Sequence, residues 1–183
     1  MKIAKYAFLA LLLTSCGNTA QVAVEEVSEP SYENYRDDTH KFSLDTPAGW
    51  EVSFDDAESG FTLSMISPLE GEGDLLQEQI EFVDASSFQL PQDNLADLRA
   101  GIKEVLVDKA GFVFVEEMEY NFGAYEGGWI TAAKPDAETK DMVTYVVTTH
   151  EGKAYYIYMY YLESSEDEYM PILEHVVASF KWL

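Results

Sequence analysis

The stretch VTYVVTTHEGKAYYIYMYYL, residues 143–162, decides the fold of this chain. Two runs rich in β-branched and aromatic residues stand on either side of a short polar segment, HEGK, at His150–Lys153. A segment of that kind joins neighbouring strands as a tight hairpin, and strands joined so closely pair antiparallel. The stretch therefore predicts two antiparallel strands, at about 141–149 and 153–162.

The second of these strands holds five of the twelve tyrosines of the chain. Successive side chains of a strand point to opposite faces of the sheet. One face then carries Tyr155, Ile157, Met159 and Tyr161, and this face is predicted to pack under a helix. The other face carries a stripe of three rings, Tyr156, Tyr158 and Tyr160, which has the amphipathic, rigid composition of a partner surface. The alternative is that the other helix or a loop covers the stripe, because large exposed apolar patches are rare on monomers.

Further strands are predicted on the N-terminal side of this hairpin. Two lie at about 112–122 and 125–133, and alternating apolar residues mark earlier ones at Phe42 and Leu44, at 61–65, and at 80–82. The segment TPAGW, residues 46–50, predicts a turn that brings Trp50 back onto the sheet.

Two segments have helical spacing instead. Leu95, Leu98, Ile102 and Leu106 predict one helix, with Asp93 or Asn94 as N-cap and Gly111 just past its end. The second is predicted from Ile172, Leu173, Val176, Val177 and Phe180, and its start is placed near Met170 because Pro171 suits a first turn.

The order is therefore strands, a helix, four strands and a helix. Neighbouring strands with short turns form antiparallel sheets, and amphipathic helices must bury their apolar faces on a sheet. The predicted fold class is α+β: a mainly antiparallel β-sheet covered by two amphipathic helices, with Trp50, Leu98, Ile102, Val176 and Phe180 in its core.

This layout resembles the PsbP/Mog1-like fold family. KFSLDTPAGWEVSF, residues 41–54, matches the family's strand, proline turn and tryptophan, and ILEHVVASFKWL, residues 172–183, matches its closing helix with a following Ser-Phe and aromatic. The resemblance covers about 33–183 and implies a sandwich that serves as a non-catalytic accessory or binding subunit. The metal sites of photosynthetic members have no matching ligand pattern here, so no metal or cofactor is expected.

The N-terminus indicates export. A basic start leads into an apolar run that is too short to span a bilayer, and this is the layout of a cleavable signal peptide at 1–15. Leu13-Thr14-Ser15-Cys16 resembles the lipobox of bacterial lipoproteins, in which the cysteine thiol carries a diacylglycerol and the new amine is acylated, here expected with palmitate. Two or more acyl chains anchor a protein stably to a membrane. Cys16, the single cysteine, is therefore the predicted lipidation site.

Residues 16–32 are predicted to be the lipidated cysteine and a flexible tether, followed by the domain at 33–183. Surface-exported lipoproteins of some bacteria carry an acidic cluster directly after the cysteine. Here the first acidic residue is Glu25, which favours a protein that faces the periplasm of a bacterial cell envelope.

Composition narrows the class of partner. The net charge is −23, which argues against nucleic acid and against an anionic lipid surface. Hydrophobic residues make up 47% of the chain and aromatic residues 14%, so the acidic chain has enough apolar surface for a folded core.

Candidate chemical sites are few. His40 with Asp37 and Asp38 could bind a divalent cation weakly, but a fourth ligand is missing and solvated turn residues are the favoured interpretation. Glu70, Glu72 and Asp74, with Glu81 further on, have the alternate spacing of calcium ligands, yet Leu75 stands where such a loop needs glycine, which favours a solvated loop. No serine lies in a Gly-x-Ser-x-Gly elbow, and the glycines of YEGGW, residues 125–129, lack the spacing of a phosphate loop.

The favoured hypothesis is a lipid-anchored, non-enzymatic accessory or binding domain of the bacterial envelope, with an envelope protein as possible partner. Two alternatives stay open. One is an envelope hydrolase or metal-dependent enzyme whose site is assembled from distant residues, and the other is a carrier of a small apolar ligand in a cavity between sheet and helices.

Overall fold

The computed structural model describes residues 30–57, 60–69, 77–87, 90, 94–135 and 140–183. Its strands are β1 (Tyr32–Asp37), β2 (Phe42–Pro47), β3 (Glu51–Ala57), β4 (Gly60–Ile66), β5 (Gln79–Asp84), β6 (Val113–Phe122), β7 (Tyr125–Lys134), β8 (Asp141–His150), β9 (Lys153–Leu162) and β10 (Lys181–Trp182). Its helices are α1 (Leu95–Glu104) and α2 (Glu166–Ser179), with three short turns of helix, η1 (Ala85–Ser87), η2 (Val105–Lys109) and η3 (Glu163–Ser165).

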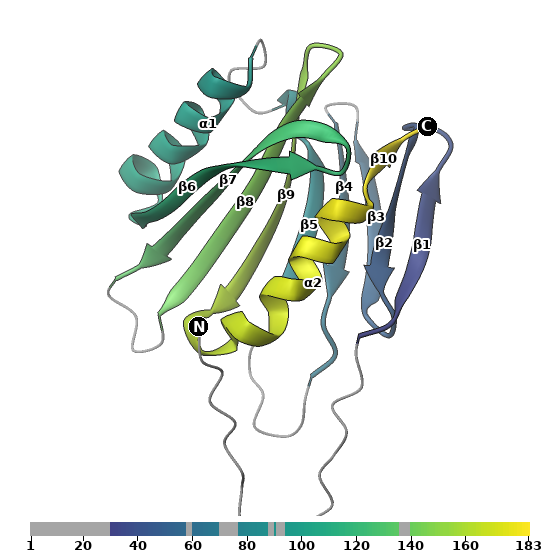
Figure 1. Cartoon of the computed structure of the whole chain (residues 1–183), viewed down its shortest axis with the longest axis horizontal. Coiled ribbons are helices and arrows are strands. Elements are labelled where there is room, and N and C mark those ends of the chain that lie inside the picture. Colours follow the sequence, from purple (N-terminus) through teal and green to yellow (C-terminus); the bar gives the residue numbers. More distant parts are fainter. Residues whose placement is uncertain (1–29, 58–59, 70–76, 88–89, 91–93, 136–139) are drawn as a thin grey trace, which may run out of the picture.

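Seven strands form the main sheet, in the order β3-β4-β5-β9-β8-β7-β6, and every neighbouring pair is antiparallel (Figure 1). The sheet consists of two meanders, β3-β4-β5 and β6-β7-β8-β9. They join where β5 pairs with β9, with Phe82 opposite Ile157. We call this junction the seam. A small second sheet has the order β1-β2-β10.

The two faces of the main sheet are covered differently (Figure 1). On one face, α2 and β2 of the small sheet pack on β4, β5 and β9, and their buried residues form one continuous core. On the other face, α1 packs on β7 and β8 over a second core. The predicted α+β class with two covering helices is confirmed, and the small sheet is an additional part of the cover.

The α1 helix begins as predicted. The Asn94 side chain accepts a hydrogen bond from the backbone N–H of Asp97 at 2.8 Å, which caps the first turn. After Glu104 the helix widens into the π-helical turn η2, and Gly111 follows with a φ of +73° that favours glycine. Leu98 and Ile102 are buried, as predicted.

The prediction for the start of α2 was wrong. The helix begins at Glu166 rather than near Met170, so Pro171 lies inside it. The acidic first turn, Glu166, Asp167 and Glu168, explains the earlier start, because negative side chains stabilise a helix N-terminus. Burial of Tyr169 adds to this, and Val176 and Phe180 are core residues as predicted.

The β8–β9 hairpin is confirmed. Its two turn residues, Glu151 and Gly152, both have positive φ, 50° and 75°, as a tight turn of this handedness requires. The prediction that Trp50 lies in the core was wrong: it is only partly buried and packs on the edge of the core, 6.1 Å from Tyr169 between ring centroids.

The YEGGW glycines have a packing role. A Cβ on Gly128 would lie 2.6 Å from the Arg99 side chain. This side chain passes over β7 here, and its guanidinium lies 2.7 Å from the Glu117 carboxylate on β6. The glycine therefore admits an ion pair between α1 and β6.

In the described part of the chain, neither helix has the length and apolar composition needed to cross a membrane.

Candidate functional site

Two adjoining cavities, of about 370 and 210 Å³, open at one end of the molecule beside the small sheet. They share His40, Phe61, Asp84 and Lys153. The remaining lining residues are Thr39, Lys41, Asp56, Ala57, Gly60, Ser86, His150, Glu151, Tyr155, Trp182 and Leu183. We call the combined site the His40 cleft.

The turn between β1 and β2 positions His40. The Asp37 carboxylate accepts hydrogen bonds from the backbone N–H groups of Thr39, at 2.7 Å, and of His40, at 2.9 Å. Lys41 then adopts a φ of 61°, which turns the chain into β2. An aspartate that bonds the backbone two and three residues onward stabilises such a turn, so the sequence DDTHK folds this way locally.

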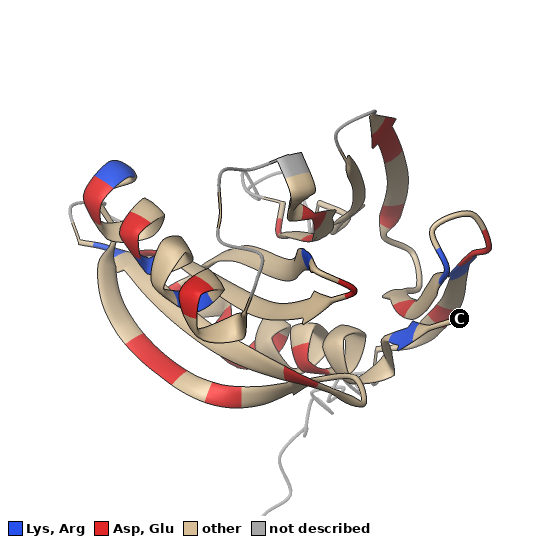
Figure 2. Ribbon diagram, turned by 90° about the horizontal axis from the view of Figure 1, so that it is seen from above, with Lys and Arg blue, Asp and Glu red and all other residues tan. Residues whose placement is uncertain are grey.

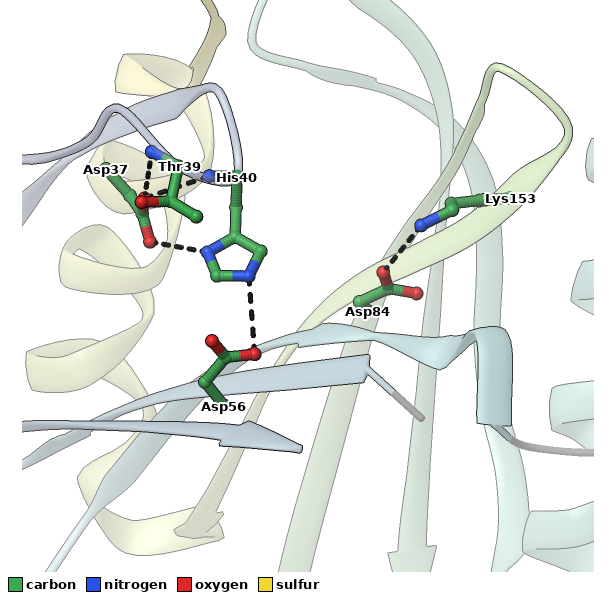
Figure 3. A network of polar contacts seen from close by, with 6 residues as sticks. All are labelled: Asp37, Thr39, His40, Asp56, Asp84 and Lys153. Atoms are coloured by element: carbon green, nitrogen blue, oxygen red, sulfur yellow. Dashed lines mark hydrogen bonds and ion pairs between the residues drawn. The ribbon is translucent and has the colours of Figure 1, made fainter. Parts of the chain in front are cut away.

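The His40 ring lies between two carboxylates (Figure 3). Its Nδ1 is 2.8 Å from Asp37 Oδ2, and its Nε2 is 3.4 Å from Asp56 Oδ1. The ring also packs on Phe61, with 4.7 Å between centroids. Burial alone would raise the pKa of Asp37, but hydrogen bonds from His40 and Thr39 outweigh this and hold that pKa below its usual value.

This geometry corrects the interpretation of His40 and Asp37 as solvated turn residues. Their side chains are only 21% and 10% exposed, because β3 and β4 pack against the turn. Asp38 takes no part in the cleft: it is 72% exposed and pairs with Arg36. Within the described ranges, no three His, Cys, Asp or Glu side chains are grouped as metal ligands.

A second charged pair lies across the cleft from His40 (Figure 3). The Asp84 side chain is only 6% exposed at the end of β5, and the Lys153 ammonium is 3.3 Å from it. The Asp84 carboxylate also accepts the backbone N–H and the hydroxyl of Ser86. Gly60 has to be glycine here, since a Cβ would lie 2.6 Å from the Asp84 carbonyl oxygen.

Aromatic rings form the third side of the cleft. The rings of Trp182 and His150 stack at 4.4 Å, and Tyr155 meets Trp182 edge-on at 4.7 Å. The Trp182 Nε1 is buried and has no hydrogen-bond partner among the described residues. Burial, together with the nearby charges of Asp84 and Glu151, raises the pKa of Tyr155 to about 12, so this phenol is neutral at physiological pH.

The charge of the cleft is mainly negative. Its lining includes three carboxylates, from Asp56, Asp84 and Glu151, and two ammonium groups, from Lys41 and Lys153. A further carboxylate, that of Asp37, lies behind His40. Acidic residues are also spread widely over the rest of the ribbon (Figure 2). Carboxylates beside aromatic rings form a surface that favours a cation over an anion.

A general base for nucleophilic catalysis has to be hydrogen-bonded to a hydroxyl or thiol. Both ring nitrogens of His40 face carboxylates instead. The arrangement is therefore that of a held, oriented imidazole that can contact a ligand.

The structure separates the three residues of the predicted tyrosine stripe. Tyr156 is buried, at 8% exposure, in the core beneath α1. Tyr158 and Tyr160 are partly buried, and their hydroxyls donate to Glu81 at 2.6 Å and to Asp141 at 2.8 Å. Tyr156 therefore cannot belong to an open surface, and a partner contact through Tyr158 and Tyr160 stays a prediction.

The opposite face of β9 agrees with its prediction: Tyr155, Ile157, Met159 and Tyr161 are buried in the α2-side core. Cys16 and the acidic residues Glu70, Glu72 and Asp74 lie outside the described residues.

Sequence reasoning did not single out Asp56, Asp84, Lys153 or Trp182 as site residues. Only Asp84 carried a usable signal, since this acidic residue ends β5 directly after Phe82 and Val83, and serines follow it two and three positions on. The others come together through strand pairing between distant segments, which no local pattern records.

No protein-family model and no curated protein sequence matches the chain. Similar folds occur among solved structures. The Ran-binding protein Mog1p of Saccharomyces cerevisiae has a TM-score of 0.55 and 10% identity, over 84% of this chain and 96% of that chain. PA94, a protein of unknown function from Pseudomonas aeruginosa, has a TM-score of 0.51 and 14% identity, over 81% of this chain and 94% of that chain.

A cyanobacterial PsbP from Synechocystis sp. PCC 6803 aligns over 93% of this chain and 99% of that chain, with 16% identity and a TM-score of 0.45. At these identities the likeness concerns the fold alone, and it is carried by Mog1p and PA94. The fold of the chain is thus that of the Mog1-like α+β sandwiches.

Proposed function

We propose that this chain is a lipid-anchored, non-enzymatic binding domain of a bacterial cell envelope, and that its His40 cleft receives a basic segment of a protein partner. The lipobox at Leu13–Cys16 supports the anchor, and the absence of an acidic cluster directly after Cys16 supports a position facing the periplasm. Mog1p, which shares the fold, is a Ran-binding protein.

The composition of the cleft carries the proposal. A lysine or arginine side chain entering it would meet Asp56 and Glu151, both exposed carboxylates, and the aromatic wall at Trp182. Opposite charges and aromatic faces both favour such a side chain. The net charge of −23 would further attract a basic partner from a distance, more strongly at low salt.

The geometry of His40 favours binding over catalysis. Its Nδ1 is hydrogen-bonded to Asp37 and its Nε2 faces the exposed Asp56 carboxylate at 3.4 Å, so neither is a nitrogen paired with a hydroxyl or thiol that a general base would activate. Binding needs no such nitrogen. The imidazole would instead help to hold Asp37 and Asp56 in place around the incoming cation.

Site-specific photo-crosslinking in intact envelopes tests the cleft. A crosslinking residue at the exposed positions Thr39 or Glu151 is expected to capture the same protein, whereas one at Asp108, on η2 across the sheet, is not. Mass spectrometry would identify the captured protein. Capture of the same set of proteins from all three positions would contradict the proposal.

Charge reversal on β3 provides a matched control. Asp56 lines the cleft, while its exposed neighbour Asp55 does not, so the two substitutions change the net charge equally. Asp56→Lys is expected to reduce capture at least ~10-fold, and Asp55→Lys only slightly. Equal effects of the two variants would mean that general charge, rather than the cleft, determines binding.

The anchor is tested separately. Cys16→Ala removes the only thiol that can carry the lipid, so the variant is expected to be released from membranes while its fold is unchanged. Membrane fractionation with circular dichroism measures both properties. An Ala variant that still sediments with membranes would show that the lipid at Cys16 is not the anchor.

A further inference from the structure

A separate cavity, of about 240 Å³, lies on the α1 side of the main sheet. It shares no residue with the His40 cleft. Its lining residues are Leu90, Ile102, Val105, Leu106, Lys109, Tyr145 and Tyr156. We call it the α1 pocket.

An unusual turn of helix forms one wall of this pocket. The backbone N–H of Ala110 donates to the Val105 carbonyl at 3.0 Å, five residues back, so the helix is π-helical here. Three of the lining residues, Val105, Leu106 and Lys109, belong to this turn. Such π turns are rare and are frequent at functional sites.

Two tyrosine rings form the facing wall. Tyr145 and Tyr156 meet at 5.3 Å and 61°, close to an edge-to-face arrangement, and Tyr145 stacks on Tyr158 at 5.1 Å and 16°. The Tyr158 hydroxyl is held by Glu81. The rings are therefore fixed in place before any ligand arrives, which lowers the entropic cost of binding one.

The remaining lining is almost wholly apolar. Leu90, Ile102, Val105 and Leu106 supply aliphatic side chains, and Lys109 is the one charged residue. The Lys109 ammonium lies 3.8 Å from the Glu104 carboxylate, so its charge is already paired.

We propose that the α1 pocket binds a small neutral aromatic molecule of about two fused rings. An apolar cavity of about 150 Å³ in another protein binds benzene, so this larger pocket fits a larger ring system. Tyrosine rings that meet edge-to-face offer the same geometry to an aromatic ligand.

The charges favour a neutral ligand over an ionic one. The net charge of −23 repels anions, and an anion would also have to displace Glu104 from Lys109. The described lining residues include no Asp or Glu that could pair with a cation.

Indole is the probe, with binding to the protein measured by calorimetry and by changes in the NMR spectrum. We expect one saturable site. Val105→Trp, which fills the pocket, should weaken indole binding at least ~10-fold, while Val107→Trp should leave it unchanged. Val105 and Val107 are exposed to a similar extent, 38% and 41%, on the same turn, and only Val105 lines the pocket.

Octanoate tests the choice of ligand class, with Lys109→Gln as the variant. Octanoate binding that exceeds indole binding and is lost in Lys109→Gln would overturn the proposal in favour of an anionic acyl ligand. Absence of saturable indole binding, or equal loss in Val105→Trp and Val107→Trp, would also overturn it. Circular dichroism checks folding, and Val105→Phe serves as a second, milder variant that fills the pocket.

Discussion

The two faces of the main sheet differ in how completely they are covered, although the same strands supply both. On the α2 side, α2 and the small sheet leave the large rings of the core almost without exposure, Phe42, Phe82 and Phe122 among them. On the α1 side a single helix covers the sheet, and Tyr145, Tyr158 and Tyr160 stay partly exposed. The pocket on the α1 side has an almost wholly apolar lining, whereas the His40 cleft, beside the small sheet, is lined by charged side chains and aromatic rings.

Strand β9 shows the difference within one element. Its α2-side residues Ile157 and Met159 have no exposed surface. Of its α1-side tyrosines, Tyr156 is buried, whereas Tyr158 and Tyr160 are only partly buried. We therefore expect the α2 side to supply more of the stability than the α1 side.

The largest expected loss of stability tests whether the α2 side contributes more than the α1 side. Phe180→Ala removes a ring that is 1% exposed. Its centroid lies 4.8 Å from that of Phe122 and 5.1 Å from that of Phe82. We expect a loss of about 3–5 kcal/mol in the free energy of unfolding. Leu98→Ala on α1 should lose less, about 2–3 kcal/mol, because a helix packed on one side only can move to fill the cavity.

Denaturant unfolding measures both variants. An equal or larger loss for Leu98→Ala would mean that the two faces contribute equally to stability.

A smaller loss of stability is expected for a substitution of Asp37, which lies beside the His40 cleft. Asp37→Asn weakens the hydrogen bonds to Thr39 and His40 and should cost about 1–2 kcal/mol at pH 7. Since the folded-state pKa of Asp37 is lowered, its contribution is present above the ordinary carboxyl pKa near ~4 and is lost as pH falls through the lower, folded-state value.

The stability difference between wild type and Asp37→Asn should therefore shrink on acidification below about pH 4. Urea unfolding at a series of pH values measures it, with Asp55→Asn at an exposed position of β3 as control. A difference that is constant down to low pH would show that ionisation of Asp37 is not responsible.

The smallest effect is expected for the hydroxyl of Tyr158. Tyr158→Phe should cost about 1 kcal/mol or less, because Glu81 keeps a hydrogen bond from Ser64 at 3.0 Å.

Changing Tyr156, Tyr158 and Tyr160 together to Ser should instead lower the melting temperature clearly, since Tyr156 is a core residue. An unchanged melting temperature for the triple variant would restore the idea of an open stripe.

Local sequence patterns predicted the elements whose structure depends mainly on their own residues. The β8–β9 hairpin follows from a four-residue turn, and α1 from its cap and periodic apolar residues. β1, β3 and β10 were not predicted, and β1 and β10 have no alternating pattern. β10 has only two residues, and both strands exist through pairing with β2.

The candidate site was predictable only in part, for the same reason. His40 and Asp37 were noticed in the sequence, but as solvated residues, because burial of their turn depends on β3 and β4 folding over it. Asp84, Lys153 and Trp182 meet only after β5, β9 and β10 have taken their places. A site assembled from strand ends leaves no compact motif in the sequence.

The seam between β5 and β9 has a consequence for the rate at which the chain folds. Each meander closes through local turns, but the seam joins segments on either side of α1, β6, β7 and β8. Closing so long a loop loses chain entropy before its contacts form, which makes this step the expected kinetic barrier. We therefore expect Phe82→Leu at the seam to slow refolding in stopped-flow experiments, and Met142→Leu, away from the seam, to act mainly on unfolding. A refolding rate that Phe82→Leu leaves unchanged would place the barrier elsewhere.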